Sequence, residues 1–115
     1  MEWRPEPMRI TIAHTKGQQQ MIQMVDRAFD DVFKGLAQGP IAPIVITDQH
    51  KAWQGNVMTF SLMAKMGFIR NPVSGTVEVT DRDVTLDADV GMLGKLIPGE
   101  KIRTALETRL RKLLA

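Results

Sequence analysis

The sequence lacks cysteine and tyrosine, and it has little histidine. Its 115 residues include no Cys, no Tyr and two His. Without Cys the chain can form neither a disulfide nor a thiolate metal site, and without Tyr it has no phenolic acid for catalysis. Nowhere do about 18 apolar residues follow one another, so no transmembrane segment is predicted. The first residues also lack the apolar run of a signal peptide, so we expect an intracellular, cytoplasmic protein.

The chain also lacks a large excess of charge of either sign. The formal net charge is +2, and acidic residues are interleaved with the basic ones along the chain. Nucleic-acid binders concentrate basic residues on one face, so we do not expect nucleic acid as a partner. The basic residues of the last predicted helix are typical of a solvated helix face. They leave contact with an anionic surface open as an alternative. These residues are Lys101, Arg103, Arg109, Arg111 and Lys112.

The length of the chain fits one domain, since two domains of half the size would have marginal cores. Residues 1–7 are polar and contain prolines, so we expect a flexible N-terminal arm. Residues 8–115 are then a single α+β domain.

Hydrophobic periodicity predicts the elements of this domain. Met8 to Ile12 alternates as a half-buried strand, and apolar residues from Met21 to Leu36 recur at helical spacing. Thr15 to Gln18 resembles a capping box for this helix. Strand patterns follow from Ile44 irregularly toward Trp53 and, after a turn at Gln54–Asn56, from Val57 to Lys65. Gly67 and Asn71-Pro72 then interrupt the run, which predicts a bulge or a hairpin connection. Two further strands flank a turn at residues 81–83. The last helix opens at Pro98-Gly99.

The pattern therefore predicts an α+β fold in the order β-α-β-β-β-β-α. Each strand has one polar and one apolar face. We expect an antiparallel sheet of four to five strands, with a long N-terminal helix and a C-terminal helix packed on one face.

No catalytic or metal-binding constellation is predicted, so we expect a protein that is not an enzyme and needs no cofactor or metal. His14 and His50 lack the spacing of metal ligands, and structural or solvated roles fit them better. Four aspartates near the predicted turn do not follow a calcium-loop pattern, and turn or solvated roles are expected. They are Asp81, Asp83, Asp87 and Asp89.

Methionine is the residue type that stands out, with eight in the chain. Met63 and Met66 lie where a sheet covered on one side would expose them to solvent or to a cavity. Together with an apolar, glycine-punctuated segment they would form an adaptable contact surface. Packing in the core is the alternative reading of the same residues. The full predicted surface is Met63, Met66, Met92, Leu93, Leu96 and Ile97.

The second half of the chain resembles a known family. The segments Pro72–Val79 and Asp83–Leu86, and the apolar positions from Leu93 to Leu114, are similar to the polyhydroxyalkanoic acid system proteins. Ile10, Ile12 and His14 before a helix add to the likeness, which covers most of residues 8–115. The resemblance implies a bacterial, cytoplasmic protein of the polyhydroxyalkanoate system, associated with granules. It supplies no catalytic residues.

Three functions are compatible with the sequence. The leading hypothesis is a non-enzymatic accessory or interaction protein that contacts polyhydroxyalkanoate granules or the proteins on them, and a homodimer remains open. The alternative is a carrier of a small apolar ligand, such as an acyl chain, held in a cavity between sheet and helices. The third is binding to an anionic surface or to a nucleic acid through the last helix, although nucleic acid is the less expected partner.

Overall fold

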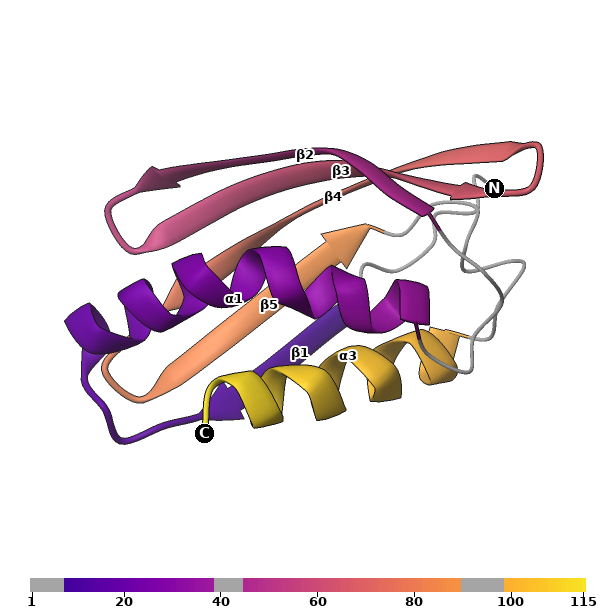
Figure 1. Cartoon of the computed structure of the whole chain (residues 1–115). Helices are drawn as coiled ribbons and strands as arrows, with labels where there is room; N and C mark the ends of the chain where they lie inside the picture. The colour runs from indigo at the N-terminus through magenta and orange to yellow at the C-terminus, as the bar shows by residue number, and fades with distance from the viewer. Residues whose placement is uncertain (1–7, 39–44, 90–98) are drawn as a thin grey trace, which may run out of the picture.

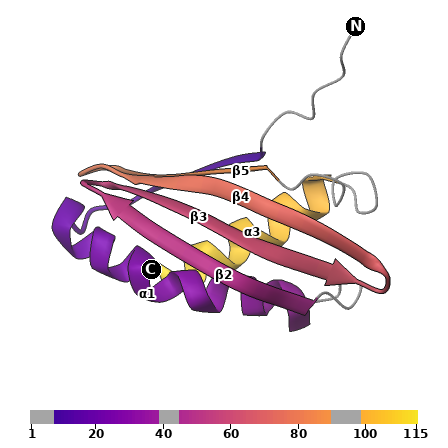
Figure 2. The same cartoon turned by 90° about the horizontal axis from the view of Figure 1, so that it is seen from above.

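Five antiparallel strands form one sheet in the order β1-β5-β4-β3-β2, and two helices cover one of its faces (Figures 1 and 2). The computed structural model describes residues 8–38, 45–89 and 99–115 of the chain. The elements are β1 (Met8–Ala13), α1 (Gln18–Gln38), β2 (Val45–Gln54), β3 (Val57–Met66), β4 (Ile69–Val79), β5 (Asp83–Asp89) and α3 (Gly99–Leu113). The predicted α+β class and the predicted element order are both confirmed.

Alternation of apolar and polar residues decides which face of each strand meets the helices. In β1, Ile10 and Ile12 are buried while Arg9 and Thr11 are exposed. In β5, Val84, Leu86 and Ala88 are buried in the same way. β1 pairs with β5 in register, with Ile10 opposite Leu86, so the apolar side chains of both strands lie on the helix face.

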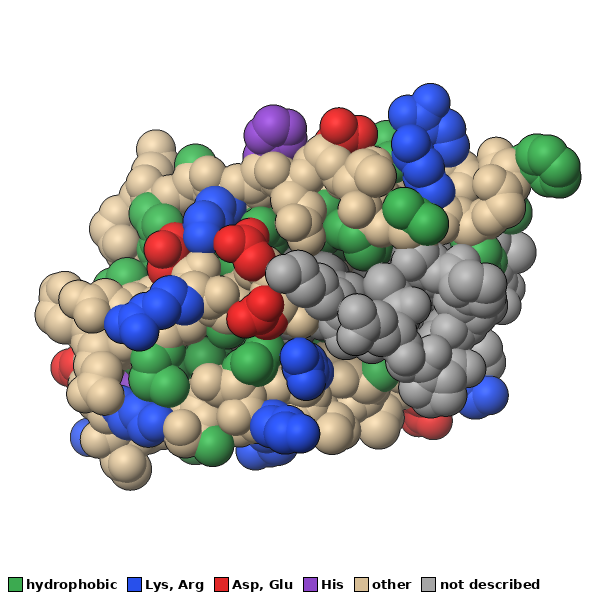
Figure 3. Space-filling model, in the orientation of Figure 1, with side chains coloured by type: hydrophobic (Ala, Val, Ile, Leu, Met, Phe, Trp, Pro, Cys, Tyr) green, Lys and Arg blue, Asp and Glu red, His purple; other side chains and the backbone are tan. Residues whose placement is uncertain are grey.

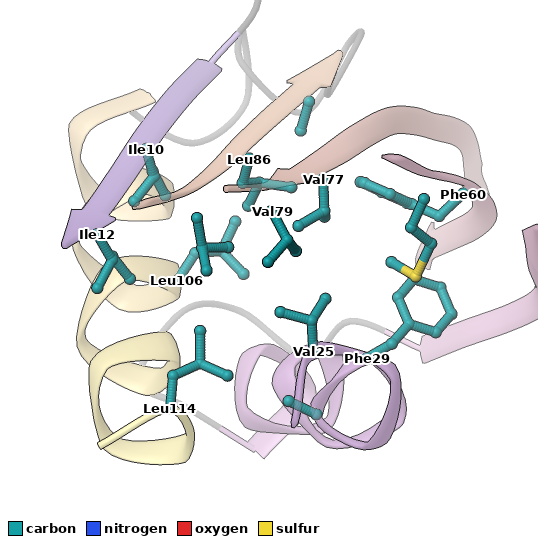
Figure 4. Packing of buried hydrophobic residues seen from close by; sticks show 14 of the residues in the cluster. Ile10, Ile12, Val25, Phe29, Phe60, Val77, Val79, Leu86, Leu106 and Leu114 are labelled. Carbon is teal, nitrogen blue, oxygen red and sulfur yellow. The ribbon is translucent and has the colours of Figure 1, made fainter. Parts of the chain in front are cut away.

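The two helices close the core from one side. α1 buries Met21, Val25 and Phe29, which recur at the three- and four-residue spacing of one helix face. α3 contributes Leu106, and Leu114 just beyond its end is also buried. Figure 4 shows the side chains of both helices pointing toward those of the strands. The helix face of the sheet therefore carries the buried apolar side chains, and the opposite face, called the open face below, is mainly polar.

Two short turns join the central strands. Gly55 lies between paired Gln54 and Val57, and Gly67 lies between paired Met66 and Ile69. Both glycines have positive φ, 61° and 62°, and they occupy the first central position of two-residue hairpin loops. This arrangement is typical of a type II′ turn, which matches the twist of the flanking strands. The turn expected at Gln54–Asn56 is confirmed.

The predicted interruption at Asn71 and Pro72 is wrong, because both residues lie inside β4, where Pro72 pairs with Met63 of β3. Within the described residues, β4 pairs with β5 only from Ser74 onward. The irregular continuation expected toward Trp53 is present as a register shift in β2, between Thr47 and His50.

The predicted capping box is also wrong. Instead of bonding back to Thr15, the side chain of Gln18 donates from Nε2 to the carbonyl oxygen of Val79 at 3.0 Å. The backbone N–H of Gln18 donates to Oδ1 of Asp81 at 3.0 Å, so the acceptor at the start of α1 comes from the β4–β5 turn. A long-range contact has replaced the local one.

The predicted N-terminal arm at residues 1–7 lies outside the described residues, and its flexibility stays a prediction.

Candidate functional site

His14 holds a corner of the fold together. Its Nδ1 accepts the backbone N–H of Lys16 at 3.2 Å, so Nε2 carries the proton and donates to the carbonyl oxygen of Thr80 at 2.8 Å. Both ring nitrogens are occupied by backbone groups. His50, the other imidazole, is exposed on β2. The two histidines lie at opposite edges of the sheet, one just after β1 and one on β2, so they do not form a shared site.

Asp26 of α1 binds the edge strand β2. Its Oδ1 accepts the indole N–H of Trp53 at 2.9 Å and lies 3.0 Å from Nζ of Lys51. The hydrogen bond from Trp53, followed by that from Lys51, lowers the pKa of Asp26 below its ordinary value. Nζ of Lys51 also lies 5.6 Å from the ring centre of Phe29. This carboxylate ties helix to strand and is not free to act as a base.

The aspartates around the β4–β5 turn also have structural roles. Asp87 accepts Nε of Arg9 at 2.7 Å across the β1–β5 pair, and this contact raises the pKa of Arg9. Asp81 is the acceptor at the start of α1. Across residues 8–38, 45–89 and 99–115, no group of three or more His, Cys, Asp or Glu side chains gathers as metal ligands would.

Local ion pairs occupy part of the basic surface of α3. Arg111 lies 2.9 Å and Arg103 3.5 Å from the carboxylate of Glu107, each one helical turn away. Such pairing is typical of a solvated helix face and leaves less charge for an external anion.

The structure separates the predicted methionine surface. Met63 lies on the open face of β3, because its neighbours Leu62 and Ala64 are buried on the helix face. Met66 is three residues further on, so it lies on the helix face and packs against the core. Met92, Leu93, Leu96 and Ile97 lie outside the described residues, so that part of the predicted surface stays a prediction.

The end of the β3–β4 hairpin carries the most exposed large apolar side chain of the described chain. Phe68 follows Gly67 in the turn, and its exposed fraction is 105%. Within the described part of β2, pairing with β3 begins at the pair Val45–Lys65, one pair before Met66 and Ile69 close the turn. Figure 3 shows hydrophobic side chains at this end of the molecule, where Figure 1 places the β3–β4 turn.

Apolar and basic side chains lie on the open face of the strand segments that lead to Phe68. Two cross-strand rows lead up to the turn, in which Lys65 lies between Val45 and Arg70, and Met63 lies opposite Pro72. Val45 is 58% exposed. We call this set the hairpin-end surface, and it consists of Val45, Met63, Lys65, Phe68, Arg70 and Pro72.

Sequence reasoning found only Met63 of the hairpin-end surface. The run from Met66 to Ile69 is apolar apart from Gly67, so Phe68 was not distinguishable from a core residue by hydrophobicity. The available signal was a glycine between two strand-like runs, followed by an aromatic residue at the second position of a two-residue turn.

The core contains a small cavity. Its volume is about 30 Å³, and it is lined by apolar side chains of the sheet and both helices, including Val25, Phe29, Phe60, Leu86 and Leu110. Ligand pockets are commonly about 300–1,000 Å³, so an acyl chain does not fit here unless the helices move.

In the parts of the chain that the structure describes, neither helix combines the length and the apolar character that crossing a bilayer demands.

Comparison with known proteins assigns a family. Neither curated proteins nor solved structures gave a significant match to the chain. A family model described as "Putative polyhydroxyalkanoic acid system protein" matches residues 8–114, which is nearly the whole chain. The match spans every strand and both helices, including the hairpin-end surface. The chain therefore belongs to the polyhydroxyalkanoic acid system protein family.

Proposed function

We propose that this chain is a non-catalytic accessory protein of bacterial polyhydroxyalkanoate metabolism that works in the cytoplasm at the surface of polymer granules. The observation that carries the proposal is the full exposure of Phe68 at the end of a hairpin. Transfer of a Phe side chain from water to an apolar phase is worth roughly 1.5–3 kcal/mol. A polyester granule is such a phase, and family membership supplies the biological context.

The hydrogen bonds of three polar side chains at the surface of the fold support a non-catalytic role. His14, Asp26 and Asp81 are each held by backbone or side-chain partners that fix the fold. A general base or a nucleophile must direct a reactive atom at the substrate, within hydrogen-bond reach. The hydrogen bonds of these three side chains are instead directed at other groups of the protein.

Fractionation of polymer-producing bacteria that express the tagged protein tests the proposal. We expect the wild-type protein to float with the granules and to become cytosolic in a strain that makes no polymer. Phe68→Asn should move it toward the cytosolic fraction. This variant creates a Gly-Asn turn, which the chain already uses at Gly55-Asn56, so we expect it to fold.

Ala52→Asn is the matched control, since Ala52 is exposed on β2 at the other end of the sheet. It should leave granule association unchanged. A wild-type protein that stays wholly cytosolic in polymer-containing cells would refute the granule role.

The second candidate is a carrier of a small apolar ligand. The apolar lining of the core cavity favours it, and the volume of about 30 Å³ weighs against it. Native mass spectrometry of the protein purified from polymer-producing cells tests this function. A co-purifying mass that disappears on denaturation would support it, and the bare chain alone would exclude it as the main role.

A further inference from the structure

We propose that the hairpin-end surface binds an anionic phospholipid surface, with Phe68 inserted among the acyl chains and with Lys65 and Arg70 against the headgroup phosphates. The inference rests on the proposed function, and it names the chemistry that the granule-facing surface recognises.

The charge arrangement carries the inference. Lys65 and Arg70 are directly opposite each other across β3 and β4 and lie on the same face. Like charges at such positions destabilise a sheet in isolation. Within the described residues neither side chain has an ion-pair partner, and the chain contains no Asp or Glu between Leu62 and Val77. An external anion is the group that would relieve this repulsion.

The geometry suits an interface between an apolar and an anionic layer. Lys65 and Arg70 lie one pair behind Met66 and Ile69, which close the turn. A strand rises about 3.3 Å per residue, so the cations follow the turn by roughly one or two such steps. Interfacial segments enter a lipid surface by about 5–10 Å. Phe68 would then reach the acyl region while both cations stay at the level of the phosphates.

Two other occupants fit less well. A second copy of the chain docked through the same surface would bring four cations together, two from each copy. Nucleic acid would find only two cations here, fewer than the six to ten phosphate contacts of a salt-sensitive binder.

Flotation of the purified full-length protein with lipid vesicles tests the inference. Vesicles of phosphatidylglycerol and phosphatidylcholine should carry the protein upward, and vesicles of phosphatidylcholine alone should carry much less. Phe68→Asn should weaken partitioning roughly 10- to 100-fold, the loss expected for one Phe side chain. Lys65→Gln with Arg70→Gln should weaken it roughly 25-fold, at about 1 kcal/mol for each charge.

The matched control is Arg27→Gln with Arg82→Gln, which removes the same charge from exposed positions on α1 and on the β4–β5 turn. It should change partitioning by less than about twofold in physiological salt. Phe68→Trp should retain binding to anionic vesicles. The fluorescence emission of the introduced tryptophan should shift to the blue with anionic vesicles only.

Several outcomes would overturn the inference. Two concern flotation: the protein does not float with anionic vesicles, or the control and the Lys65/Arg70 variants lose the same amount of partitioning. Two others name a different partner: the protein binds a single-stranded oligonucleotide but no vesicles, or it forms a dimer in the absence of vesicles that Phe68→Asn dissociates. If granule association in cells is lost in Phe68→Asn while vesicles never bind, the proposed function stands and this inference fails. If the protein binds anionic vesicles but does not associate with granules in cells, this inference stands and the proposed function fails.

Discussion

Gly75 of β4 is the position where one added methyl group should matter most. A Cβ at this residue would collide with the carbonyl oxygen of Asp87 and would lie 2.9 Å from both Cα of Ala88 and Cζ of Phe60. Two of these three atoms belong to the backbone of β5, which cannot move without breaking its pairing with β4. We therefore expect Gly75→Ala to destabilise the protein by about 3 kcal/mol, at the upper end of the usual cost of overpacking.

This loss is measurable by urea denaturation followed by circular dichroism. For a chain of this size it corresponds to a fall in Tm of roughly 10 °C. Ser74→Ala is the control, because Ser74 is the exposed neighbour of Gly75 and its change should stay within about 0.5 kcal/mol. A Gly75→Ala protein within about 0.5 kcal/mol of wild type would refute the argument.

A double variant separates the two causes of the strain. Phe60 lies opposite Gly75 and packs on Phe29 of α1, with ring centres 5.6 Å apart. If the ring were the main obstacle, Phe60→Leu would restore much of the loss in the Gly75→Ala background. Since backbone atoms of β5 also collide, we expect a coupling energy well below the full cost of Gly75→Ala.

Three further predictions concern the remaining supports of the fold. Asp26 has a lowered pKa in the folded protein, so the stability that its carboxylate contributes is fully present above the ordinary aspartate pKa of 3.8 and is lost as the pH falls through the lowered, folded-state pKa. The Tm difference between wild type and Asp26→Asn should therefore shrink between pH 7 and pH 3. A constant difference would contradict this. Leu106→Ala should cost about 2–5 kcal/mol in urea denaturation because Leu106 is 2% exposed, whereas the exposed neighbour Thr108 should tolerate Ala. Asp81→Ala should cost about 1 kcal/mol in the same assay, since the first N–H of α1 loses its acceptor, and an unchanged midpoint would contradict the capping role.

The sequence predicts the parts of the fold in which local pattern and final structure agree. Alternation places Ile10 and Leu86 on the buried face, and helical spacing does the same for Val25 and Phe29. The errors arise where a distant partner decides. Gln18 bonds to Val79, 61 positions away, and no local rule contains that contact.

The candidate site was harder to predict than the fold. Phe68 has the hydrophobicity of a core residue, and only the pairing of Met66 with Ile69 reveals that it lies in the turn. Lys65 and Arg70 become neighbours through the same pairing. The residues that share a surface across two strands are set by the pairing register of those strands. In an apolar run such as Met66 to Ile69, hydrophobicity alone does not determine that register.

The pairing of β1 with β5 has a consequence for the order of folding. Arg9 and Asp87 are 78 positions apart, whereas β2 to β5 are joined by short turns. Closure of a long loop costs more entropy than closure of a short one, and non-local pairing slows folding. We therefore expect the β2–β5 meander to form first. β1 leaves the ribosome before the other four strands yet has to wait for β5, and its apolar residues stay open to solvent until β5 has emerged.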